Sequence, residues 1–100
     1  MRRAARKDGN HNQVADWLMQ LGAGAVVDTS MIGGGFPDQL VRIGRAFYPA
    51  EVKDPSQSPS KRKLTDDQVA WWGRHGIEPV ILETLDDCAA FVHNARMCNA

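Results

Sequence analysis

Apolar residues recur at helical spacing in three segments of the chain. The first segment, 12–21, carries an apolar stripe whose members are three or four residues apart: Val14, Trp17, Leu18 and Leu21. This spacing places side chains on one face of an α-helix. A second helix is predicted between Thr65 and His75, because Thr65 and Gln68 have the spacing of a capping box. A third is predicted after Thr84, with a buried face formed by Leu85, Cys88, Ala89 and Val92.

Short apolar runs bounded by turn residues predict four strands between these helices. The extended segments are expected at 25–29, 38–43, 46–53 and 79–83. Gly44 and Arg45 form the expected turn between the second and third strands. Pro49 has no N–H to donate to a neighbouring strand, so the third strand should be bulged or open on one side there. With a polar loop at 54–63, the predicted order is αβββαβα in one α/β domain.

Length and charge limit the chain to one small domain without an overall basic character. One hundred residues can bury a single modest core, and 12 basic residues balance 12 acidic ones. Positive charge nevertheless gathers in two clusters: Arg2, Arg3, Arg6 and Lys7 in a basic arm at 1–9, and Lys61, Arg62 and Lys63 in the polar loop. Such clusters are commonly solvated surface, but beside a site for phosphate they would contact a DNA backbone.

The cysteines and the lack of a long apolar run indicate a cytoplasmic protein with no membrane contact. Cys88 and Cys98 do not form a disulfide framework, so reduced thiols are expected. Together with His93 they also fit no zinc-finger spacing. The basic N-terminus lacks the apolar region of a signal peptide, and no apolar run reaches the length of a membrane span.

Two carboxylates and an amine fall on the predicted hairpin. Asp38 opens one strand, and Glu51 and Lys53 end the next. Since side chains alternate along a strand, Glu51 and Lys53 project from the same face. Converging carboxylates bind hard cations such as Mg²⁺, and a metal, its bound water and an ammonium group are the parts needed to hydrolyse a phosphodiester. The run Gly33–Gly35 before Asp38 is either a plain turn or a means of bringing the backbone close to metal and phosphate.

With these residues the sequence resembles the PD-(D/E)xK nucleases, and more narrowly the small stand-alone VRR-NUC-type nucleases of phages and prophages, which are similar to Holliday-junction resolvases. The resemblance covers about residues 7–92. It is carried by three stretches: Gly35-Phe36-Pro37-Asp38, Glu51-Val52-Lys53 and the segment LTDDQVAWW at 64–72. It implies a restriction-endonuclease-like core, in which a mixed central sheet is flanked by helices.

The resemblance also implies a role for each residue of the motif. Asp38, Glu51 and the Val52 carbonyl would bind Mg²⁺ or Mn²⁺. Lys53 would orient the attacking water, and Gln68 would line the site. The implied catalytic set is therefore Asp38, Glu51, Lys53 and Gln68. Alternatively, Gln68 serves in the capping box with Thr65. One side chain can do this and also line the site.

The chain departs from the family's pattern in its first helix. Relatives tend to carry a glutamate there that touches a metal-bound water, and Gln13 takes that position here. Asp16, one turn further on, is the candidate substitute. The leading hypothesis is a Mg²⁺- or Mn²⁺-dependent endodeoxyribonuclease that acts as a homodimer on branched DNA, such as a Holliday junction, in a bacterial or phage-infected cell. The alternative motivated by Gln13 is a nucleic-acid-binding module with weak or lost catalysis.

Trp71 and Trp72 are adjacent, so they cannot share one face of the predicted helix. Trp72 is expected in the core. Trp71 is expected to be exposed, where it would serve as a dimer contact or stack on unpaired bases.

Overall fold

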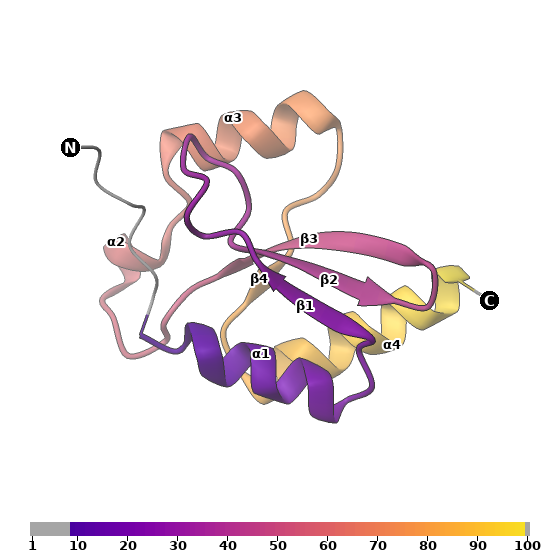
Figure 1. The fold of residues 1–100 in the computed structure, drawn as a ribbon. Helices are drawn as coiled ribbons and strands as arrows, with labels where there is room; N and C mark the ends of the chain where they lie inside the picture. Colours follow the sequence, from indigo (N-terminus) through magenta and orange to yellow (C-terminus); the bar gives the residue numbers. More distant parts are fainter. Residues whose placement is uncertain (1–8, 100) are drawn as a thin grey trace.

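Four strands form one mixed sheet with helices on both of its faces (Figure 1). The computed structural model describes residues 9–99. The helices are α1 (His11–Gln20), α2 (Pro59–Arg62), α3 (Asp66–His75) and α4 (Leu85–Asn99), and the strands are β1 (Ala25–Asp28), β2 (Gln39–Ile43), β3 (Ala46–Val52) and β4 (Ile81–Leu82). The predicted α/β class and element order are confirmed, with one difference: α2 is a single-turn helix inside 54–63, for which the sequence predicts a loop. None of the described helices has the length and apolar character needed to cross a membrane.

The first three strands form an antiparallel meander, and β4 joins it in parallel. The sheet order is β1-β2-β3-β4, so β1 and β4 are its edges. A two-residue turn at Gly44-Arg45 connects β2 to β3, and Gly44 has the positive φ of 62° that such a turn favours. β3 pairs with β2 from Ala46 to Ala50 but with β4 only at Glu51 and Val52.

Pro49 is accommodated without a bulge. It pairs in register with Leu40 of β2, whereas Glu51 and Lys53 donate their backbone N–H groups to carbonyls on the β4 side. Because alternate residues of a strand direct these groups the same way, the nitrogen of Pro49 faces the side that the short β4 does not reach. The prediction that this strand is open on one side is confirmed, and the bulge is not formed.

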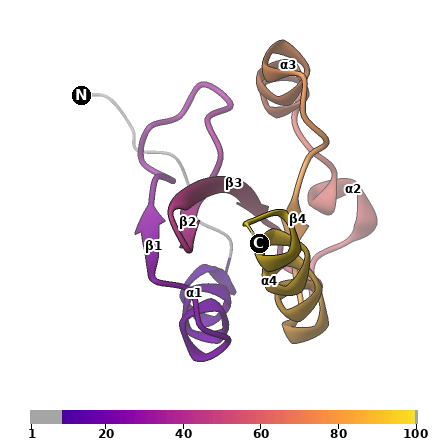
Figure 2. The ribbon, with the colours of Figure 1, turned by 90° about the vertical axis from the view of Figure 1, so that its right-hand side faces the viewer.

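The hydrophobic core lies between the sheet and the helices α1 and α4, which run side by side beneath it (Figure 2). Its buried members come from both helices and from three strands: Val14, Leu18, Val41, Ile43, Ala50, Val52, Leu82, Cys88 and Val92. The predicted buried face of α4 is partly wrong, because Leu85 and Ala89 are exposed while Phe91 and Ala95 pack inwards. Phe91 meets Tyr48 of β3 edge-on, with ring centroids 6.0 Å apart, so the face of α4 that meets the sheet includes Phe91 and Ala95 in place of Leu85 and Ala89.

α3 lies on the other face of the sheet, away from α1 and α4 (Figures 1 and 2). Its predicted capping box is present in both directions. Thr65 Oγ1 accepts the N–H of Gln68 at 3.2 Å, and Gln68 Oε1 accepts the N–H of Thr65 at 2.9 Å. Gly76 ends the helix in the left-handed conformation, as expected for a glycine at that position. Local sequence therefore determines where α3 begins and ends.

Candidate active site

Asp38 and Glu51 lie opposite each other at the end of the β2–β3 hairpin. The antiparallel register pairs Gln39 with Ala50, and one further step along both strands sets Asp38 against Glu51. Residues opposite one another share a face of the sheet, with Cβ atoms typically about 4.5–5.5 Å apart. Burial, and after it the charge of Asp38 and a side-chain hydrogen bond with it, raise the pKa of Glu51. The two carboxylates are therefore close neighbours.

Glu51 is a fully buried side chain held by two residues of α3. Trp72 Nε1 donates to Glu51 Oε2 at 2.9 Å, and Gln68 Nε2 donates to Glu51 Oε1 at 3.2 Å. Burial raises the pKa of Glu51 from 4.5 to about 7, with the Trp72 hydrogen bond and the charge of Lys53 opposing the shift. Without a cation, Glu51 thus keeps a proton in a large fraction of molecules at neutral pH, and a divalent cation would displace that proton.

Lys53 is linked to Glu51 through Gln68. Its side chain is buried, and Lys53 Nζ donates to Gln68 Oε1 at 3.0 Å. The same oxygen accepts the N–H of Thr65 in the capping box, while Gln68 Nε2 reaches Glu51. The two roles considered for Gln68 are therefore geometrically combined, since one side chain closes the start of α3 and contacts both Glu51 and Lys53.

The backbone of Val52 faces Asp38. Its N–H donates to Asp38 Oδ2 at 2.8 Å. Within a strand the N–H and C=O groups of one residue point to the same side, so the Val52 carbonyl is directed to the Asp38 side of β3. This is the side on which the predicted ligand set requires it.

The loop before Asp38 is fixed at both ends. Thr29 Oγ1 donates to the Pro37 carbonyl at 2.6 Å, and Thr29 N–H donates to the Asp38 carbonyl at 2.9 Å. All three glycines of the run Gly33–Gly35 have positive φ, and a Cβ on Gly35 would lie 2.2 Å from the backbone oxygen of Asp67. Gly35 therefore lets the loop pack against the backbone of α3, and the positive φ of all three glycines suits the turn before Asp38.

The tryptophans differ from the prediction in one respect. Trp72 is 2% exposed and belongs to the interior, as predicted, but it also donates a hydrogen bond to Glu51. Trp71 is half-buried rather than exposed, because Phe36 packs against it at a centroid distance of 5.6 Å. Phe36 comes from the glycine loop, so the sequence of α3 alone could not show that Trp71 is partly covered.

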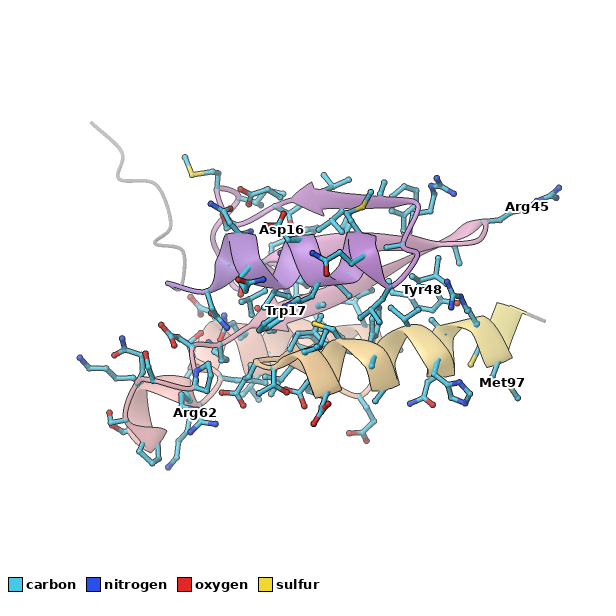
Figure 3. All side chains as sticks on the ribbon, turned by 90° about the horizontal axis from the view of Figure 1, so that it is seen from below. Asp16, Trp17, Arg45, Tyr48, Arg62 and Met97 are labelled. Atoms are coloured by element: carbon cyan, nitrogen blue, oxygen red, sulfur yellow. The ribbon has the colours of Figure 1, made fainter. Side chains whose placement is uncertain are left out.

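Several residues predicted for the site lie away from the carboxylates. Gln13 and Asp16 are exposed on α1, which packs on the core face of the sheet, whereas Glu51 faces α3; Figure 3 views the molecule from the α1 side, with Asp16 labelled. In the loop, Lys61 and Lys63 are exposed, while Arg62 Nε is bound to Glu83 Oε2 at 2.6 Å. The remaining basic residues, Arg2, Arg3, Arg6 and Lys7, lie outside the described residues.

Asn10 is a structural residue of the site region that the sequence does not reveal. It precedes α1, yet its side chain makes no capping hydrogen bond. Instead, its amide nitrogen donates to the carbonyls of Lys53 at 2.9 Å and Glu83 at 3.2 Å. These partners are 43 and 73 residues away along the chain, so no local pattern could have identified them. Asn10 ties the start of α1 to the strand end that carries Lys53.

The donor atoms of the site are oxygens, which suit a hard divalent cation such as Mg²⁺ or Mn²⁺. The candidate ligands are the carboxylates of Asp38 and Glu51 and the carbonyl of Val52. Within residues 9–99 there is no group of three or more His, Cys, Asp or Glu side chains suited to a metal. Two carboxylates and one carbonyl are few protein ligands, and Mg²⁺ commonly completes its coordination with water and substrate.

An apolar cavity of about 340 Å³ is separate from these residues. It lies between β4 and α4, with Tyr48, Ile81 and Phe91 in its wall. Neither Asp38 nor Glu51 lines it.

Comparison of the chain with protein-family models, curated proteins and solved structures gave no match. The residues and geometry of the site are therefore the basis for assigning a function.

Proposed function

We propose that this protein is a Mg²⁺- or Mn²⁺-dependent endodeoxyribonuclease with a restriction-endonuclease-like core of the PD-(D/E)xK type. The observation that carries the proposal is the pairing of Asp38 with Glu51 across the hairpin end, with Lys53 on the Glu51 face of β3. Burying a carboxylate and an amine costs free energy unless they are well compensated. A domain with a purely structural role would gain nothing from burying a carboxylate and an amine at this position.

The residues would divide the work of phosphodiester hydrolysis. Asp38, Glu51 and the Val52 carbonyl would hold the cation, which neutralises the scissile phosphate and lowers the pKa of bound water. Lys53, held by Gln68, would orient the attacking water and stabilise negative charge developing on the phosphate. Trp72 and Gln68 hold the Glu51 carboxylate in one position, which favours a preorganised site.

We extend the proposal to a homodimer that acts on branched DNA, such as a Holliday junction. Apolar side chains are exposed on the sheet face that carries the site: Val27 is 43% and Phe47 is 54% exposed. Phe47 is four residues before Glu51 on β3 and therefore shares its face. A second copy packed there would cover this surface and set two Asp38–Glu51 sites at a fixed separation, which suits a substrate with two strands to cut.

A nucleic-acid-binding module with weak or lost catalysis is the second candidate. It is favoured by the first helix, where Gln13 replaces an acid and Asp16 is exposed on the far face of the sheet. The two candidates differ in whether bound DNA is cut.

Cleavage of supercoiled plasmid and of a four-way junction in Mg²⁺ or Mn²⁺ tests the proposal. The wild type should cut at least one substrate, and Glu51→Gln should abolish cutting. Glu78→Gln, the same change at an exposed glutamate outside the site, is the matched control and should cut normally. Binding without cutting would favour the second candidate, and neither binding nor cutting would refute both.

A further inference from the structure

Three rings form a series beside the proposed active site. Phe36 meets Trp71 edge-on, with ring centroids 5.6 Å apart and planes at 69°. His75 stacks on Trp71, with ring centroids 4.2 Å apart and planes at 28°. Trp71 therefore joins the glycine loop to the end of α3.

The three rings are close in the chain to residues of the site. Phe36 is two residues before Asp38, and Trp71 directly precedes Trp72, which donates to Glu51. His75 is three residues beyond Trp72, a rise of about 4.5 Å along the helix. The series is thus connected, through the glycine loop and α3, to the residues that carry and hold the carboxylate pair.

His75 is exposed, yet its ring is held in place. Its Nδ1 lies 2.8 Å from the Trp71 carbonyl oxygen, and because a carbonyl only accepts, Nδ1 is the donor. One face of the ring is stacked on Trp71, while the residue remains open to solvent. An exposed aromatic ring that is already ordered loses little conformational freedom when a ligand stacks on it.

We propose that His75 stacks on an unpaired base of DNA next to the scissile phosphate. The inference rests on the proposed nuclease function, because it is the phosphate at Asp38 and Glu51 that would bring a neighbouring base to α3. Bases in a continuous duplex are already stacked on one another, whereas an unpaired base offers a free face to an aromatic ring. The substrate class is therefore DNA with a single-stranded stretch or an opened branch point.

Binding of two DNA probes measured by fluorescence anisotropy tests this, with Ca²⁺ as the cation so that binding is read without cleavage. One probe is a duplex with a single-stranded tail, and the other is the same duplex with the tail paired. The wild type should prefer the tailed probe. His75→Ala should weaken binding of the tailed probe by roughly tenfold, the loss of one base stack, and leave the paired probe unchanged. His75→Phe, which keeps an aromatic ring, should retain the preference.

His93→Ala is the matched control, since His93 is an exposed histidine on α4, on the opposite side of the sheet. It should bind both probes like the wild type. Equal wild-type affinity for the two probes, or an equal loss on both in His75→Ala, would overturn the proposal. So would dissociation of a dimer in His75→Ala with the probe preference unchanged, because the ring would then serve a contact between copies.

The same probes in Mg²⁺ or Mn²⁺ separate this inference from the function on which it rests. Cutting without preference for the tailed probe would refute stacking by His75 and leave the nuclease standing. A preference that depends on His75, in a protein that cuts neither these probes nor the plasmid and four-way junction, would support the stack and refute the nuclease.

Discussion

Successive residues at the end of β3 face two different environments. Ala50 and Val52 enter the apolar core with α1 and α4, whereas Glu51 faces α3 and is held there by hydrogen bonds. Both sets are buried, but one face is closed by hydrophobic packing and the other by polar contacts through Gln68 and Trp72. The difference indicates that one strand end stabilises the fold on one side and presents chemical groups on the other.

The two faces should respond differently to mutation. Apolar burial is favourable without any partner group, so the core face should govern stability. A buried carboxylate is stable only with its hydrogen bonds and its proton or a cation, so the α3 face should govern pH dependence and activity. Three measurements test this division and a fourth concerns DNA contacts outside it, in order of decreasing expected effect.

Leu18→Ala should cause the largest loss of stability. Leu18 is completely buried in the core, and removing its side chain there should lower the free energy of unfolding by roughly 2–5 kcal/mol. Urea denaturation measures this, with Met19→Ala as control, since the adjacent methionine is 49% exposed. An equal loss in both variants would show that the α1 face is assigned wrongly.

Glu51 should make stability fall as pH rises in the absence of a metal. Burial, opposed by Trp72 and reinforced by Asp38, raises its pKa from 4.5 to about 7, so the folded chain binds this proton more tightly than the unfolded chain. The stabilisation is complete below pH 4.5 and is lost as pH rises through about 7, a change of roughly 3 kcal/mol.

Urea denaturation in the presence of a chelator at pH 5 and pH 8 measures this change. Glu51→Gln should remove it, and Glu78→Gln should retain it. The same pH dependence in wild type and Glu51→Gln would contradict the assignment of the buried proton to Glu51.

Lys53→Ala should reduce DNA cleavage by about a hundredfold or more while DNA binding changes little, because a positioned charge acts mainly on the transition state. Single-turnover cleavage and separate binding assays distinguish the two effects. Arg45→Ala, at an exposed basic residue in the turn at the other end of the hairpin, should keep nearly full activity. Unchanged cleavage by Lys53→Ala would move the water-orienting role to another group.

The smallest expected effect concerns the loop lysines. Each phosphate contact contributes about 0.9 to the slope of log binding affinity against log salt concentration for duplex DNA. If Lys61 and Lys63 each contact a phosphate, replacing both with Ala should make this slope shallower by about 1.8. Arg62 is left in place because it is paired with Glu83. The loss should be similar for all DNA sequences, since phosphate contacts do not read bases. An unchanged slope would leave the two lysines as ordinary solvated surface.

Much of the hairpin and of α3 could be predicted because their determinants are local. Asp38 and Glu51 are each six residues from the two-residue turn at Gly44-Arg45, so that turn by itself makes them partners. Thr65 and Gln68 are one helical turn apart and close the capping box without help from the rest of the fold. The buried face of α4 was less predictable, because it includes the contact of Phe91 with Tyr48, which is 43 residues away along the chain.

The sequence by itself determined the order of the elements other than α2, the hairpin register and the face shared by Asp38, Glu51 and Lys53, because these follow from alternation, helical spacing and turn residues within short segments. The tertiary structure alone decided what surrounds that site. It brought Trp72 to Glu51, Asn10 to Lys53 and Phe36 over Trp71. These pairs are 21, 43 and 35 residues apart, so their contacts arise only when whole elements pack, and no local periodicity encodes them.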